Sequence, residues 1–155
     1  MPLNIKYGIS TWLWTSPFTT QSIQELFPKI AKLGFDVVEI AVENPSLIDI
    51  KKVKSALNEH GLKASICGAF GSSRDLTNES KQVQQTGLTY IEACLDICAE
   101  IGIDFFGGPM YSAVGKARMQ SAMQGGKQIN LPEVTLSDKL DKRRNTLTKY
   151  LKTGR

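Results

Sequence analysis

Histidine and cysteine are scarce in this chain of 155 residues. His60 is the only histidine, and Cys67, Cys94 and Cys98 are the only cysteines. Cys94 and Cys98 lie four residues apart on an expected helix, and the further ligands that a zinc site needs are missing, which excludes a zinc cluster. We therefore expect the three thiols to be small, buried groups in a protein from a reducing compartment.

Long apolar stretches are also lacking. No run approaches the roughly 18 apolar residues of a membrane-spanning helix. Residues 1–6 show no basic segment followed by a long apolar stretch, so we expect no secretory signal. Apolar residues make up 41% of the chain and charged residues 22%, as in ordinary globular domains. The sequence predicts a cytoplasmic protein that has no membrane partner.

Charge is distributed unevenly along the chain. Residues 1–115 carry 9 Lys and Arg against 12 Asp and Glu, a net charge of −3, whereas residues 116–155 carry 10 against 3, a net charge of +7. We divide the chain into a main domain, 1–118, and a basic tail, 119–155, that is partly disordered or helical. The tail lacks the interleaved aromatic residues of a single-strand binding platform, which disfavours nucleic acid as a partner.

A short sequence pattern recurs three times: a helix end, a glycine, an apolar residue, then a charged residue that opens a β-type run. The glycines are Gly34, Gly61 and Gly102. A glycine just past a helix accepts the left-handed conformation that lets the chain turn back into a sheet, so three repeats predict α-to-β units and a parallel sheet. The expected strands are 5–10, 37–41, 64–67 and 105–106, and the expected helices are 22–33, 49–61 and 79–101.

Local signals refine the expected helices. Ser22 and Glu25 have the spacing of a capping box, and Asp49 is placed to cap the second helix. Pro28 is expected to kink the first helix or to delay its regular part. Gly87 should allow the third helix to approach its neighbour closely. Crossovers between parallel strands are right-handed almost without exception.

Ligands of parallel α/β folds bind at the carboxyl ends of the strands. Aromatic residues beside glycines at these ends suit a small polyol, because rings cover its apolar face and glycines let the backbone approach its hydroxyls. Structural roles also fit these positions: the tryptophans suit a core, the carboxylate an inward-facing strand position, and the paired glycines a strand-ending turn. The candidate binding residues are Trp12, Trp14, Glu39, Cys67, Gly68, Gly107 and Gly108.

The ordered series of segments resembles the opening of ketose 3-epimerases of the tagatose and allulose type, which belong to the xylose isomerase-like TIM barrel superfamily. The resemblance spans roughly residues 5–118. It implies an incomplete (β/α)8 barrel with about four parallel strands and three to four helices. The segments are Tyr7-Gly8-Ile9, Ala31 to Ile40, Ile66-Cys67-Gly68, Asp75-Leu76-Thr77, the long third helix and Gly107 to Ser112.

The resemblance also implies a divalent metal, manganese or a similar ion, held by Glu, Asp, His and Glu. Two of these glutamates would move the proton at C3 of the ketose through an enediolate. In the family the ligands come from the later strands of a barrel of about 250 residues or more. This chain leaves the family pattern near Met119, so we assign it no catalytic and no metal-binding residue. The candidate residues carry over as sugar-pocket residues.

Two interpretations of function stay open. The chain is either a sugar isomerase or epimerase family protein that does not turn over a ketose by itself, or a non-enzymatic half-barrel that binds a sugar weakly or a partner through its basic tail. Four parallel strands cannot close a barrel, and an open parallel sheet leaves two edges and one face uncovered. We therefore predict that the chain associates with itself or with a complementing second half-barrel.

Overall fold

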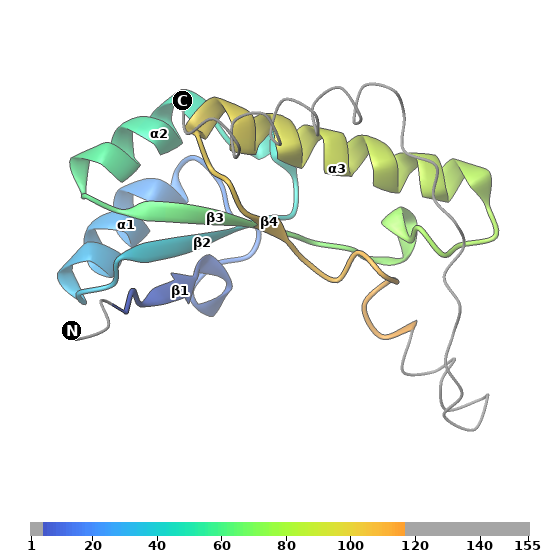
Figure 1. Ribbon diagram of the computed structural model, residues 1–155, viewed down its shortest axis with the longest axis horizontal. Coiled ribbons are helices and arrows are strands. Elements are labelled where there is room, and N and C mark those ends of the chain that lie inside the picture. The colour runs from blue at the N-terminus through green and yellow to red at the C-terminus, as the bar shows by residue number, and fades with distance from the viewer. Residues whose placement is uncertain (1–4, 117–155) are drawn as a thin grey trace.

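The computed structural model describes residues 5–116, which form one parallel sheet with helices on one side (Figure 1). The strand order is β1-β2-β3-β4, and all three pairings are parallel. This confirms the predicted half-barrel of four parallel strands with three helices. The predicted boundary at residue 118 and the tail 119–155 lie outside the described residues. The elements are β1 (Gly8–Ser10), α1 (Ser22–Lys32), β2 (Val37–Val42), α2 (Ile50–Glu59), β3 (Lys63–Gly68), α3 (Lys81–Ile101) and β4 (Phe106–Gly107).

The three helices end in the same way, as the glycine pattern predicts. Gly34, Gly61 and Gly102 have φ angles of 85°, 63° and 86°. The amide of the residue after each glycine donates to the carbonyl five residues earlier, with N···O distances of 3.3, 2.9 and 2.8 Å in chain order. This is the bond of a Schellman motif, which satisfies helix-terminal carbonyls while the chain reverses.

The helix starts agree only in part with the sequence signals. Asp49 caps α2, because its Oδ1 accepts a hydrogen bond from the Lys52 amide at 3.1 Å. The capping box predicted at Ser22 is wrong: Ser22 is the first helical residue, and its hydroxyl oxygen accepts from the Thr19 amide at 3.2 Å. Helix α1 includes Pro28 and begins at Ser22, so the proline does not delay its regular part.

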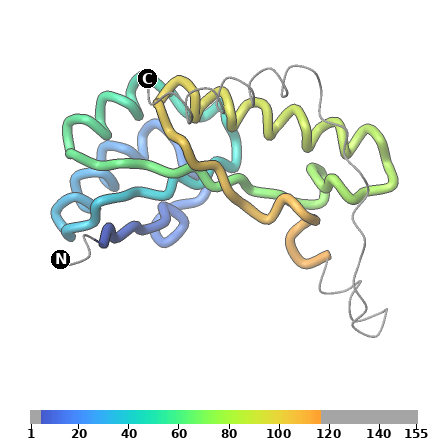
Figure 2. Tube along the Cα trace, in the orientation of Figure 1, coloured from blue at the N-terminus to red at the C-terminus, as the bar shows by residue number. Residues whose placement is uncertain are grey.

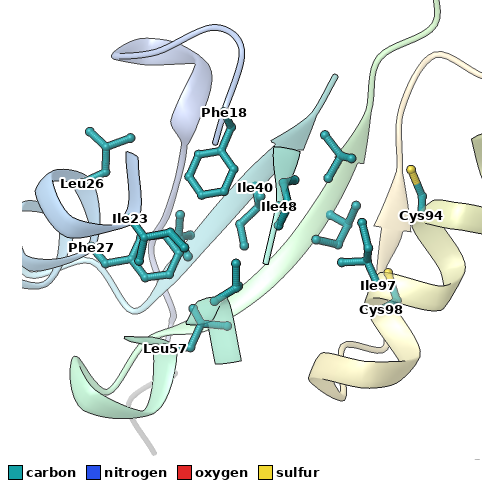
Figure 3. Packing of buried hydrophobic residues seen from close by; sticks show 14 of the residues in the cluster. Phe18, Ile23, Leu26, Phe27, Ile40, Ile48, Leu57, Cys94, Ile97 and Cys98 are labelled. Atoms are coloured by element: carbon teal, nitrogen blue, oxygen red, sulfur yellow. The ribbon is translucent and has the colours of Figure 1, made fainter. Parts of the chain in front are cut away.

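The core lies between the sheet and the helices (Figure 3). Val38, Ile40 and Val42 alternate along β2 on the helix side and are at most 1% exposed. Phe18, just before α1, stacks on Phe27 with ring centres 6.2 Å apart. Leu33, the C-cap residue of α1, continues the helical period of the buried residues but is 58% exposed.

The residues between these core positions lie on the opposite side of the sheet, since side chains alternate along a strand. Ser10, Glu39 and Ser65 form one cross-strand row, and Cys67 pairs with Gly107 nearer the carboxyl ends. All three helices of the described chain lie on the other side. We call this surface the open face.

Candidate functional site

The carboxyl ends of the four strands meet at one edge of the sheet, where the connecting loops gather. After β1 comes a short 3₁₀ helix, η1 (Thr11–Leu13), and after β3 another, η3 (Ser72–Arg74). The segment after β4 runs beside the loop that holds η3 (Figure 2). The Val114 amide joins them by donating to the Phe70 carbonyl at 2.9 Å.

Glu39 and Cys67 share the open face on adjacent strands. Glu39 lies in the row between Ser10 and Ser65, and all of these side chains are half-buried. Partial burial raises the pKa of the Cys67 thiol, and the Glu39 carboxylate raises it further. Cys67 is therefore a neutral thiol at pH 7. Two hydroxyls flanking a carboxylate supply both donors and acceptors for the hydroxyls of a sugar.

The candidate glycines have different surroundings. A Cβ on Gly68 would lie 2.8 Å from the Phe70 ring, and one on Gly108 would lie 2.6 Å from the Gly68 carbonyl oxygen. Gly108 also has a φ of 140°, which disfavours other residues. The chain's own atoms thus fill the space beside Gly68 and Gly108. A Cβ on Gly107 would meet only the Phe105 ring, at 3.3 Å, so this glycine leaves room on the open face.

The two tryptophans lie in different environments. Trp12, in η1, is 41% exposed, and its indole Nε1 donates to Oε1 of Glu43 at 2.9 Å. Trp14 is half-buried against the core, and Lys29 Nζ lies 4.7 Å from the centre of its ring. The core alternative therefore fits Trp14 and does not fit Trp12. Binding of a sugar by any of the seven candidate residues stays a prediction.

Sequence reasoning missed the polar role of Tyr90. Its hydroxyl accepts from the Ala69 amide at 2.7 Å and donates to the Val42 carbonyl, which joins the carboxyl ends of β2 and β3. Burial raises the pKa of this phenol well above its ordinary value. The Arg74 guanidinium lies 4.0 Å from the ring centre. Tyr90 lies on the buried side of α3, but its position in the helix carries no information about what its hydroxyl reaches.

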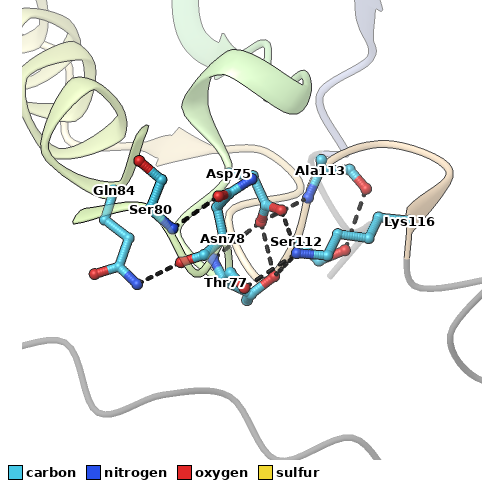
Figure 4. A network of polar contacts seen from close by, with 8 residues as sticks. All are labelled: Asp75, Thr77, Asn78, Ser80, Gln84, Ser112, Ala113 and Lys116. Carbon is cyan, nitrogen blue, oxygen red and sulfur yellow. Dashed lines mark hydrogen bonds and ion pairs between the residues drawn. The ribbon is translucent and has the colours of Figure 1, made fainter. Parts of the chain in front are cut away.

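A buried ion pair fastens the segment after β4 (Figure 4). The Asp75 side chain is 1% exposed and that of Lys116 is 26% exposed. Oδ1 of Asp75 accepts from the Thr77 amide at 2.9 Å and from the Ala113 amide at 3.3 Å, and Oδ2 accepts from Lys116. Burial raises the pKa of Asp75, but the hydrogen bonds from Lys116 and Thr77 outweigh it and hold the pKa below its ordinary value.

Metal ligands do not gather in the described chain. Among residues 5–116, no group of three or more His, Cys, Asp or Glu side chains could hold a metal ion. These residues therefore do not fit the metal that the resemblance implies. Cys67, Cys94 and Cys98 are free thiols, and burial raises the pKa of Cys94 to about 11 and that of Cys98 to about 12.

None of the helices within residues 5–116 combines the length and apolar character needed to cross a bilayer.

Comparisons with curated proteins support the resemblance to ketose 3-epimerases. The chain is 34% identical over 122 residues to a ketose 3-epimerase of Arthrobacter globiformis, a match that covers 79% of this chain and 42% of that protein. It is 27% identical over 111 residues to a probable ketose 3-epimerase of Synechocystis sp., covering 72% of this chain and 38% of that protein. The chain thus spans about two fifths of the length of these relatives.

Solved structures share the fold. D-allulose 3-epimerase from Methylomonas sp. in complex with D-allulose superposes with a TM-score of 0.66 at 23% identity, over 70% of this chain and 38% of that one. An L-ribulose 3-epimerase superposes with a TM-score of 0.63 at 17% identity, over 81% of this chain and 48% of that one. The sequence profile of the family described as xylose isomerase-like TIM barrel matches residues 27–139, a range that crosses the predicted boundary at 118. Because this match covers more than half of the chain, the protein belongs to the xylose isomerase-like TIM barrel family.

Proposed function

We propose that this chain provides the sugar-facing first half of a ketose 3-epimerase-like barrel and does not epimerise a ketose by itself. The observation that carries the proposal is the row of Ser10, Glu39 and Ser65 on the open face. In a closed barrel this face points inward, and the loops at its carboxyl ends form the binding site. The relatives named above are ketose 3-epimerases, and the Methylomonas enzyme was solved in complex with D-allulose.

The proposed ligand is a small ketose. The exposed ring of Trp12 offers an apolar surface at the rim, and Glu39 with its flanking serines offers hydrogen-bonding groups on the sheet. A divalent metal, which the resemblance implies, would polarise the ketose oxygens when bound. We propose that its ligands come from outside residues 5–116, and that residues 1–118 act as the sugar-facing domain.

Partners follow from the free edges of the sheet. In the described chain β1 pairs only with β2, and β4 only with β3. We propose that a second copy of this chain or a complementing half-barrel covers the open face. Light scattering behind gel filtration should show association of the chain. A compact monomer at low concentration would contradict this part of the proposal.

Binding of a ketose can be tested on the full chain by calorimetric titration with D-allulose, with the aldose D-glucose as the control ligand. We expect weak binding of the ketose, further weakened by Glu39→Gln and unchanged by Glu59→Gln on the exposed end of α2. Absence of ketose binding would refute the sugar-binding role.

Turnover is a separate test. The chain is incubated with D-allulose and manganese, and the ketoses are separated by chromatography. We expect no C3-epimerised product from the chain alone. Formation of that product would contradict our assignment of no catalytic residue to this chain.

A second candidate function rests on the charge of residues 116–155, which is +7 against −3 for the preceding residues. Such a segment is suited to an acidic partner. Salt-sensitive binding of nucleic acid that is lost when residues 117–155 are deleted would favour this function.

A further inference from the structure

Glu43 follows β2 directly and accepts three hydrogen bonds from one distant segment. Its Oε1 accepts from the Trp12 indole at 2.9 Å and from the Ser16 hydroxyl. Its Oε2 accepts from the Phe18 amide at 3.0 Å. All three donors belong to residues 12–18, the loop that joins β1 to α1, so a single carboxylate ties this loop to the end of β2.

The carboxylate holds the middle of a loop whose ends have other contacts. At the start, Thr11 is fully buried, and its hydroxyl oxygen accepts from the Ala41 amide at 3.0 Å. At its far end Phe18 is fully buried and stacks on Phe27 of α1. Between the end of β1 and Phe18, Leu13 is 67% exposed and Trp12 is 41% exposed. The indole N–H of Trp12 points to Glu43, at an N···O distance of 2.9 Å.

The carboxylate is suited to this task in its ionised form. Partial burial raises the pKa of Glu43, but the hydrogen bonds from Ser16, Phe18 and Trp12 outweigh it and hold the pKa below its ordinary value. At neutral pH both oxygens are therefore acceptors, and hydrogen bonds to an ionised acceptor are about twice as strong as those between neutral groups.

We propose that Glu43 is the positioning residue that holds the Trp12 indole at the carboxyl-end rim, so that the ring packs against a bound ketose without donating a hydrogen bond to it. The use of the ring in sugar binding rests on the proposed function. The indole N–H is already given to Glu43, which leaves the π-face as the surface that Trp12 offers. Trp14 differs, because its ring packs on the core and faces Lys29.

The test uses the full chain labelled with ¹⁵N at its two tryptophans, Trp12 and Trp14. Each indole N–H gives one NMR signal, and the two are assigned with Trp14→Phe. Glu43→Gln keeps the shape of the side chain and removes its charge. Glu59→Gln, on the exposed end of α2, is the matched control. Thermal unfolding of each variant shows whether the fold is retained.

We expect Glu43→Gln to move the Trp12 signal, and to leave the Trp14 signal and those of the control unchanged. D-allulose should then bind about tenfold more weakly than to the wild type, the scale of one hydrogen bond's contribution. The unfolding temperature should fall by a few degrees while unfolding stays cooperative, because the glutamine side chain keeps only part of the hydrogen bonds. A Trp12 signal that stays in place would overturn the positioning role. A displaced indole with unchanged ketose affinity would overturn the role of the ring in binding.

The indole measurement is made without sugar, so it separates this inference from the proposed function. If the wild-type chain binds no ketose, the proposed function and the sugar contact of Trp12 both fail. The shift of the Trp12 signal in Glu43→Gln would still show that Glu43 holds the ring. Should Glu43→Gln lose its fold, the pH titration of the wild-type Trp12 signal gives the same answer, because protonation of Glu43 in acid must move it.

Discussion

The ion pair between Asp75 and Lys116 should stabilise the fold far more than the exposed pair between Lys6 and Asp36. Asp75 is 1% exposed and cannot regain water when Lys116 is removed, whereas the Lys116 side chain is 26% exposed and can. Replacing Lys116 by Met keeps the aliphatic stem and takes away one charge-assisted bond to a buried carboxylate. Since breaking a buried pair costs about 3–5 kcal/mol and Lys116 is partly solvated, we expect a loss of about 2 kcal/mol in the free energy of unfolding.

Urea unfolding of the wild type, Asp75→Asn, Lys116→Met and the double variant measures this contribution. With a slope of about 2 kcal/mol per molar urea, the loss corresponds to a midpoint lower by about 1 M. The double-mutant cycle should return a coupling of about 1–2 kcal/mol between the two side chains. Lys6→Met is the control, because Lys6 and Asp36 form a pair at 2.9 Å whose side chains are 54% and 33% exposed. Its midpoint should not change measurably.

Acid provides the second arm of the same experiment. The pKa of Asp75 is lowered in the folded chain, so the contribution of the pair is complete above the ordinary carboxyl pKa. It is lost as the pH falls from that value through the lowered one, and the wild type and Lys116→Met should then converge in stability. A coupling of zero at neutral pH, or a Lys116→Met midpoint equal to that of Lys6→Met, would refute the reasoning.

Three further predictions concern the carboxyl-end edge. Gly87→Ala should destabilise the chain by about 1–2 kcal/mol in thermal unfolding, because the new Cβ would lie 2.7 Å from the Arg74 carbonyl oxygen. Alanine otherwise favours a helix over glycine by about 1 kcal/mol, so a stabilised variant would contradict this prediction. Tyr90→Phe should lower the free energy of unfolding in urea by about 1–3 kcal/mol, because it leaves the Ala69 amide and the Val42 carbonyl unpaired. The control is Tyr111→Phe, since Tyr111 is 59% exposed, and an equal loss in this variant would contradict the prediction. Glu39→Gln should lower the pKa of Cys67 and speed its alkylation by iodoacetamide at pH 8, since the carboxylate raises that pKa; an unchanged rate would show that the two groups do not interact.

The fold was predictable wherever the signal is local. A glycine that ends a helix adopts a left-handed conformation whatever its distant contacts. Gly34, Gly61 and Gly102 therefore marked the three helix ends and so predicted the order of helices and strands. The apolar residues of α1 recur at the helical period, and Ile23, Leu26, Phe27 and Ile30 are all buried. The capping box at Ser22 was wrong for a local reason as well. Ser22 lies inside the helix, one residue after the N-cap Gln21, and its hydroxyl oxygen accepts from the Thr19 amide in the preceding turn.

The groups that organise the candidate site were not predictable, because their partners lie far away in the sequence. Glu43 reaches donors 25 to 31 residues earlier, and Asp75 reaches Lys116 41 residues later. Neither spacing leaves a pattern in a single sequence. Period two along β2 and β3 would have placed Glu39 and Cys67 on one face, but only the register shows that the row of Glu39 includes Ser10 and Ser65.

The short edge strands limit how another molecule can extend this sheet. β1 has three residues and β4 has two, so another polypeptide that paired with either edge strand would form few backbone hydrogen bonds. Short borders are one means by which proteins avoid runaway stacking of strands into fibrils. A specific partner must therefore be recognised by the shape and chemistry of its side chains. Non-specific strand pairing with unrelated polypeptides would gain little free energy.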